Sequence, residues 1–112
     1  MVYAKVQLFE KDLQEKSDLF KALSHPARLA ILRYLASRKV CITGDITEEL
    51  PLSRTTVNQH LAELKRVGLI QGDIEGTRTN YCLNPSKISE LSCGAHDFFN
   101  ELQSTGKEPC KQ

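Results

Sequence analysis

Two short predicted helices joined by a turn of three residues constrain the fold of this chain more than any other feature. Asp45 and Glu48 have the spacing of a capping box, which indicates that the first of these helices begins there, and Pro51 ends it. Ser53 is placed to cap the second helix, whose apolar side chains share one face. This spacing is typical of a helix-turn-helix.

A β-hairpin is predicted directly after this helix pair. Segments 69–75 and 77–83 flank Gly76, and a turn there would join them as antiparallel strands. Alternation along the second strand points Tyr81 toward the core. A further short strand is expected near Val40. Together these elements predict a winged helix-turn-helix, a mainly α fold with a small β-hairpin (α+β).

Further helices are predicted on both sides of this unit. Apolar residues three, four and seven apart between 6 and 23 indicate the first helix. Ser24-His25-Pro26 begins the next, with Ser or His as its cap, and this helix is apolar enough to be the buried centre. The last helix begins at Asn84 and carries a heptad-like seam that suggests a partner helix. The predicted order is therefore α-α-α-α-β-β-α.

A chain of 112 residues and 12.6 kDa has room for one hydrophobic core. We assign residues 1–104 to a single domain and residues 105–112 to a flexible C-terminal tail. The sequence contains no signal peptide and no apolar run long enough to span a bilayer, so we expect a cytoplasmic protein without a membrane partner. An enzyme is not predicted, because no nucleophile–base pair and no phosphate-binding glycine loop is recognisable.

The charge of the chain does not by itself identify its binding partner. The net charge is only +1, although five cations and no acidic residue fall between Lys21 and Gly44, where folding could gather them against phosphate. The near-zero total is compatible with an alternative: a protein-interaction winged-helix module that dimerises without binding DNA. Binding to random duplex at low salt would separate the two hypotheses.

The second helix of the pair presents a polar face suited to DNA. An α-helical period of about 3.6 residues that buries Val57 turns Gln59 outward and leaves Asn58 at the edge. Amide side chains can pair with adenine, and arginine can reach guanine or phosphate. Hydroxyls near the helix N-terminus suit phosphate, and an arginine in the hairpin suits a minor groove. The predicted DNA contacts are Ser53, Arg54, Thr55, Asn58, Gln59, Arg66 and Arg78.

Three stretches carry a resemblance to a known family: LSHPARLAIL at 23–32, DITEELPLSRTTVNQHLAELKRVGLI at 45–70 and EGTRTNYCL at 75–83. They resemble the ArsR/SmtB family of bacterial winged-helix repressors. The resemblance implies binding to double-stranded operator DNA with a palindromic sequence, and release by an inducer. It places operator reading on Arg54, Thr55, Asn58 and Gln59. Two histidines that match the family, His25 and His60, are expected to pack rather than to contact bases.

The resemblance also implies a homodimer with the first and last helices at the interface. Apolar residues of these two helices are the expected contacts. They are Phe9, Leu13, Ile88, Leu91, Ala95, Phe98 and Leu102.

The two common metal sites of the family cannot be carried over to this chain. A C-x-C pair would fall on Ile42 and Gly44, and the ligands of the last helix would fall on Pro85, Lys87, Phe98 and Glu101. A thiolate site for a soft metal or metalloid inducer, or a thiol redox switch, would need other residues. These are Cys41, Cys93, His96 and Cys110. Inert thiols are an equally open interpretation, and no cofactor is expected to be required for folding.

Overall fold

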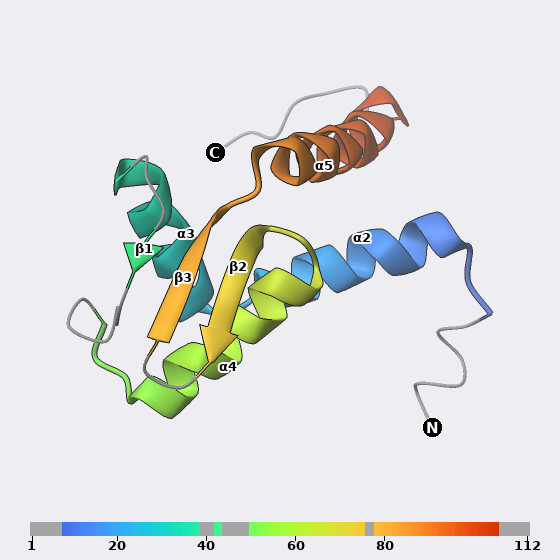
Figure 1. The fold of residues 1–112 in the computed structure, drawn as a ribbon. Helices are drawn as coiled ribbons and strands as arrows, with labels where there is room; N and C mark the ends of the chain where they lie inside the picture. Colours follow the sequence, from blue (N-terminus) through green and yellow to red (C-terminus); the bar gives the residue numbers. More distant parts are fainter. Residues whose placement is uncertain (1–7, 39–41, 44–49, 76–77, 106–112) are drawn as a thin grey trace.

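The computed structural model describes residues 8–38, 42–43, 50–75 and 78–105 (Figure 1). In chain order its elements are α2 (Lys11–Ala22), α3 (Pro26–Arg38), β1 (Ile42–Thr43), α4 (Arg54–Arg66), β2 (Ile70–Glu75), β3 (Arg78–Leu83) and α5 (Pro85–Thr105). The predicted mainly α fold with a small hairpin is confirmed. The helix predicted to begin at Asp45, the turn at Gly76 and residues 106–112 lie outside the described residues.

The three strands form one antiparallel sheet in the order β1-β3-β2. β2 and β3 are the predicted hairpin, with Ile70 opposite Leu83 at its base. β1 is the short strand expected near Val40, and its Ile42 pairs with Tyr81. Gly72 has a φ of 123°, and a Cβ at this position would overlap the carbonyl oxygen of Asn80. The close approach of the two strands therefore requires glycine there.

The hydrophobic core lies where α3, α4 and the sheet meet. α4 packs against β2, and α3 packs against both α4 and β3. Tyr81 is 1% exposed and faces this core, as its alternation in the strand predicted. The other large, fully buried side chains come from α3, α4 and β2, and they are Ile31, Leu35, Val57, Leu61, Leu64 and Ile70.

α2 begins at Lys11, so the prediction of a helix throughout 6–23 is wrong for residues 8–10. Leu8 and Phe9 precede the helix and are 84% and 61% exposed. An apolar stripe indicates which face of a helix can be buried, but it does not fix where backbone hydrogen bonding begins. Only two side chains of α2 are buried, and both lie in its C-terminal half: Leu19 and Ala22.

α3 is buried on one face only, which corrects the prediction that it forms the buried centre. Its buried residues follow helical spacing: Ala27, Ile31 and Leu35. Leu29 is 51% exposed on another side of the same helix. The number of apolar residues measures hydrophobicity, whereas burial also needs a neighbouring element on each side. The predicted cap is supplied by His25, because its Nδ1 accepts a hydrogen bond from the N–H of Ala27 at 3.0 Å.

α5 follows β3 directly and extends from the sheet on the same side as α2 (Figure 1). Asn84 precedes this helix, and its Oδ1 accepts a hydrogen bond from the N–H of Lys87 at 3.3 Å. The ring of Phe20 in α2 lies 6.2 Å from that of Phe98 and 6.1 Å from that of Phe99, centroid to centroid. No helix in the described ranges combines the length and apolar character that a bilayer crossing needs.

Candidate nucleic-acid interface

α4 is held so that one of its faces is buried and the other is presented outward. Ser53 has extended backbone angles, and its Oγ accepts a hydrogen bond from the N–H of Thr56 at 3.3 Å. The same hydroxyl donates to Oγ1 of Thr56 at 3.0 Å, so a phosphate contact by Ser53 would compete with this cap and stays a prediction. Three apolar side chains on the inner face are at most 1% exposed: Val57, Leu61 and Leu64.

The other face of α4 carries the polar side chains that helical periodicity predicted to point outward. Arg54, Thr55 and Gln59 are exposed. Asn58 is half-buried at the edge of this face, again as predicted. We call these four residues the α4 outer face. Two amides and one guanidinium on a single turn and a half of helix can donate to and accept from base edges, and the Thr55 hydroxyl suits phosphate.

Arg66, which the sequence also assigned to DNA, is engaged within the protein. Its Nη1 and Nη2 donate to Oδ2 and Oδ1 of Asp18 in α2 at 2.8 and 2.9 Å. Nη2 also donates to Oε2 of Glu63 at 2.9 Å. Hydrogen bonds from Arg66 lower the pKa of both carboxyl groups below their ordinary values. A phosphate contact by Arg66 would have to displace two carboxylates, and it stays a prediction.

Behind the α4 outer face, His60 is 8% exposed and packs in the protein, as expected. Its Nδ1 accepts a hydrogen bond from Nε of Arg28 at 3.0 Å, and its ring centroid lies 4.4 Å from that of His25. Arg28 also donates from Nη1 to the carbonyl oxygen of Ala22 at 3.2 Å. Burial lowers the pKa of His60, and the nearby charges of His25 and Arg28 lower it further. His60 therefore joins α4 to the start of α3 in its neutral form.

The hairpin places Arg78 beside its tip. Arg78 is the first residue of β3 and pairs in register with Glu75, the last residue of β2. A contact between Arg78 and a DNA minor groove stays a prediction.

The described part of the structure does not bring the candidate inducer-binding residues together. Cys93 and His96 are both exposed on α5. Cys41 and Cys110 lie outside the described residues. Within residues 8–38, 42–43, 50–75 and 78–105, no group of three or more His, Cys, Asp or Glu side chains could hold a metal ion. A thiolate site at these positions stays a prediction.

The residues predicted for the dimer interface divide into an exposed set, an internal set and the half-buried Phe98, whose ring lies near that of Phe20. Phe9, Leu13 and Leu102 are 61%, 41% and 52% exposed. The internal set lines a cavity between α5 and the rest of its own chain, and it consists of Ile88, Leu91 and Ala95. Phe99 is 53% exposed and was missed, because the heptad-like count ran through its neighbour Phe98. Interface roles for all of these residues stay predictions.

A family model described as a helix-turn-helix domain matches residues 23–72. A helix-turn-helix-type transcriptional regulator of Methanocaldococcus jannaschii is 31% identical over 78 residues, which are 70% of this chain and 88% of that protein. The transcriptional activator HlyU of Vibrio cholerae is 30% identical over 77% of this chain and 79% of its own. The structure of an ArsR-like transcriptional regulator from Rhodococcus matches with a TM-score of 0.61 at 22% identity, over 81% of this chain and 85% of that one. This chain belongs to the helix-turn-helix-type transcriptional regulators. Its fold is that of the ArsR-like regulator from Rhodococcus.

Membership of the helix-turn-helix-type transcriptional regulators determines the class of function. The relatives are named transcriptional regulators, which identifies a DNA-binding regulator of transcription rather than an enzyme or a protein-interaction module. The matched segment spans α3, the turn at 51–53, α4 and the start of β2. It therefore contains the whole α4 outer face.

Proposed function

We propose that this helix-turn-helix regulator is a homodimeric repressor of the ArsR type, which reads a palindromic operator with two copies of the α4 outer face. The observation that carries the proposal is the division of one capped helix, with Asn58 and Gln59 toward its outer side and buried Val57 and Leu61 on its inner side. An α-helix fits the major groove of DNA, and its N-terminal residues reach the base edges. Asn58 and Gln59 would supply the readout of bases.

The first turn of α4 would hold the phosphate backbone. Arg54 and Thr55 are exposed there, where the N-terminal end of a helix favours negative charge. Arg78 would add a minor-groove contact from the hairpin. Arg66 enters the proposal as a support of α4 rather than as a DNA contact, because Asp18 and Glu63 already accept its hydrogen bonds.

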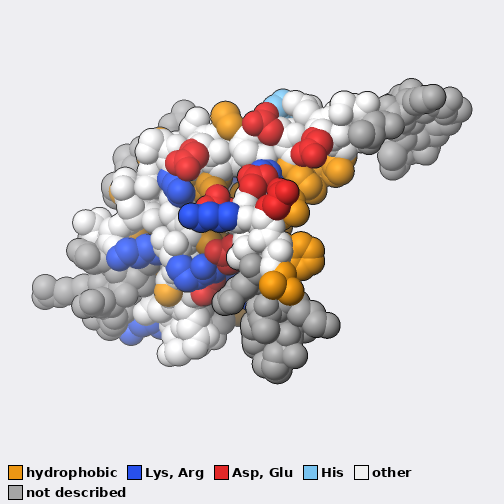
Figure 2. Space-filling view, turned by 90° about the vertical axis from the view of Figure 1, so that its right-hand side faces the viewer, with side chains coloured by type: hydrophobic (Ala, Val, Ile, Leu, Met, Phe, Trp, Pro, Cys, Tyr) orange, Lys and Arg blue, Asp and Glu red, His pale blue; other side chains and the backbone are white. Residues whose placement is uncertain are grey.

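Exposed apolar side chains on the side of α2 and α5 support the homodimer. Leu13, Phe99 and Leu102 are 41%, 53% and 52% exposed. Figure 2 views the molecule from the side toward which α2 and α5 extend, and it shows hydrophobic side chains gathered along one edge. Exposed apolar patches of this kind mark interaction sites, and a two-fold axis would make this one self-complementary. The two α4 helices would then enter major grooves about one helical turn apart.

We further propose that an inducer releases the protein from its operator. We also propose that the protein is located in the cytoplasm. The thiol version of the inducer rests on Cys93 and His96, which are exposed on α5. Titration of the reduced protein with arsenite, Zn(II) and a mild oxidant, while operator release is followed, tests this version. Release at stoichiometric reagent supports a thiol inducer, and no release by any of the three removes it.

Selection of an operator from a random duplex pool, followed by gel-shift titration, tests the base-reading role. Wild-type protein is expected to prefer the selected duplex over a scrambled duplex of equal composition. Asn58→Ala and Gln59→Ala should each reduce that preference roughly 5- to 150-fold, because a bidentate base contact is worth about 1–3 kcal/mol. Gln103→Ala, a comparable change at an exposed position of α5, is the matched control and should keep the preference. Full preference in both α4 variants would contradict the proposal.

A further inference from the structure

Arg28 connects three helices through hydrogen bonds from a single guanidinium. It lies in the first turn of α3 and is half-buried. Its Nη1 donates to the carbonyl oxygen of Ala22, the last residue of α2, at 3.2 Å, and its Nε donates to Nδ1 of His60 in α4 at 3.0 Å. His60 directly follows Gln59 of the α4 outer face. Because the guanidinium is planar and its donors point in fixed directions, Arg28 orients the inner side of α4 against α2 and α3.

The hydrogen bond between Arg28 and His60 requires a neutral imidazole ring. Nδ1 of His60 accepts from Arg28, so the ring proton of the neutral form is on Nε2. A second proton would bind Nδ1 and turn this acceptor into a donor that faces the donor of Arg28. Arginine does not give up its own proton in proteins. Protonation of His60 therefore breaks the bond and places two positive charges in contact.

The surroundings of His60 oppose this second proton. Burial lowers the pKa of His60, and the charges of His25 and Arg28 lower it further. The ring centroid of His25, which precedes α3, lies 4.4 Å from that of His60. Nδ1 of His25 also acts as an acceptor, because the N–H of Ala27 donates to it. A proton on either ring nitrogen would therefore cost a hydrogen bond and repel a neighbouring cation.

The carboxylates near this end of α4 are engaged with another arginine. Glu63, three residues after His60 in α4, and Asp18 in α2 both accept hydrogen bonds from Arg66. β2 also packs against α4, and its residues 70–72 carry no titratable side chain. A positive charge on His60 would therefore be poorly balanced.

We propose that Arg28 is a positioning residue for operator reading, which holds the α4 outer face in its reading orientation through neutral His60, so that acid weakens operator selection. The inference rests on the proposed function, because it concerns how α4 reads bases. Contact residues must be held to within about 0.5 Å of their productive geometry, and loss of the bond behind Gln59 would disturb that geometry. The expected sign is distinctive, because added positive charge ordinarily strengthens binding to DNA.

Operator preference measured from about pH 7.5 to about pH 5.0 tests the inference. The preference is the affinity for the selected operator divided by that for a scrambled duplex, so a general gain of positive charge cancels. The wild-type preference should fall at least about threefold below about pH 6.5, and not more than about tenfold per pH unit, the limit for one proton. Circular dichroism verifies that the protein is folded at each pH. A constant preference in the folded wild-type protein would overturn the inference.

Histidine variants locate the titrating group. His60→Asn, whose amide oxygen can still accept from Arg28, should keep its operator preference within about twofold over the whole pH range. His96→Asn removes an exposed histidine of α5 and should show the wild-type decline. His25→Asn replaces the cap of α3 by another good N-cap residue and should keep most of the decline. A decline in His60→Asn as large as that of the wild-type protein would overturn the inference.

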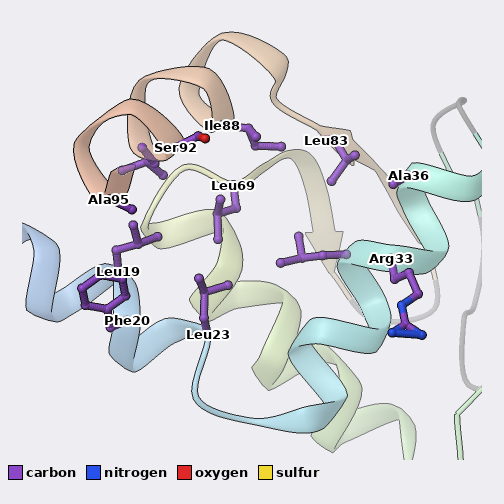
Figure 3. Close-up of a pocket in the computed structure, with 12 residues that line it drawn as sticks. Leu19, Phe20, Leu23, Arg33, Ala36, Leu69, Leu83, Ile88, Ser92 and Ala95 are labelled. Carbon is purple, nitrogen blue, oxygen red and sulfur yellow. The ribbon is translucent and has the colours of Figure 1, made fainter. Parts of the chain in front are cut away.

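Arg28→Lys tests the positioning role without acid. Lysine keeps the positive charge, but it lacks the planar fork that holds Ala22 and His60 together. Operator preference at about pH 7.5 should therefore fall about threefold or more. The matched control is Arg33→Lys, which should keep the preference, because Arg33 is exposed on the same helix and its guanidinium points away from α5 (Figure 3). Unchanged preference in a folded Arg28→Lys would overturn the positioning role.

Failure of this inference is distinguishable from failure of the proposed function. A wild-type protein that prefers no selected duplex at about pH 7.5 would contradict base reading by α4 itself. A preference that is present at about pH 7.5 but insensitive both to acid and to Arg28→Lys would leave operator reading intact and remove the role of Arg28.

Discussion

Asp18 in α2 and Arg66 at the end of α4 form a two-point ion pair across 48 positions of the sequence, at 2.8 and 2.9 Å. The pair joins the helix that carries the α4 outer face to a helix of the proposed dimer interface. Two parallel N–H···O bonds fix an orientation as well as a distance. Arg66 and Asp18 are both close to half exposed, so the contribution of the pair to the free energy of unfolding is small. Its main consequence is geometric, because it determines where α4 lies relative to α2.

Asp18→Asn is therefore expected to weaken operator binding by up to about fivefold, while the free energy of unfolding falls by about 1 kcal/mol or less. Gel-shift titration and urea denaturation measure the two effects. The matched control is Asp12→Asn, which removes the ion pair with Lys16 in the same helix and should leave operator affinity unchanged. Tighter operator binding by Asp18→Asn would contradict the supporting role, since release of Arg66 to contact phosphate would produce that result.

His60 should make the stability of the protein depend on pH. Burial holds the pKa of folded His60 below its ordinary value of 6.5, so the unfolded chain binds the proton more readily. The stability supplied by neutral His60 is present above about pH 6.5 and declines as the pH falls toward the folded-state pKa. Urea midpoints at about pH 7.5 and about pH 5.5 measure this decline. His60→Asn, whose amide can still accept from Arg28, should show a smaller decline, and an equal one would contradict this origin.

The one-sided burial of α3 predicts different outcomes for two aliphatic residues two positions apart. Ile31 is completely buried, and Ile31→Ala should reduce the free energy of unfolding by about 2–5 kcal/mol. Leu29 is 51% exposed, and Leu29→Ala should change it by about 0.5 kcal/mol or less. Denaturation of the two variants in parallel checks the difference. Equal losses would mean that both sides of α3 are covered.

Two leucines of nearly equal exposure test the position of the dimer interface. Leu102 on α5 is 52% exposed and Leu29 on α3 is 51% exposed. Leu102→Asp should weaken self-association at least tenfold, because it places a charge in the proposed apolar interface, whereas Leu29→Asp should not. Sedimentation equilibrium measures the dissociation constant. A dimer that Leu102→Asp leaves intact would exclude this part of α5 from the interface.

The sequence was sufficient to predict the features that depend only on residues close together along the chain. The Ser53 cap, the buried side of α4 and the inward direction of Tyr81 all follow from local spacing, and the structure shows each of them. Pairing between elements could not be predicted in this way. Helical periodicity correctly predicted that Arg66 faces outward from α4. It carries no information about Asp18, which comes close to Arg66 only in the folded arrangement of α2 and α4.

The sequence also could not predict what the first half of the apolar seam on α5 faces, because this too depends on pairing between elements. A seam of apolar residues shows that a helix has a partner, but it does not identify that partner. Ile88 was assigned to the interface with a second copy of the chain, and that role stays a prediction. Within its own chain, Ile88 faces a cavity bordered by α2, α3 and the hairpin. The exposed Phe99, beside the seam, was overlooked for a related reason. The position of a residue in a heptad indicates the direction in which its side chain points, but not whether another part of the domain lies close enough to cover it.

Methylation interference on the selected operator tests most directly whether two α4 helices enter the major groove. We predict interference by methylation at guanine N7, which lies in the major groove, in two patches centred about one helical turn apart. Gln59→Ala should weaken the dependence on base identity within those patches, and Gln103→Ala should not. A single patch, or interference confined to adenine N3 in the minor groove, would contradict the account.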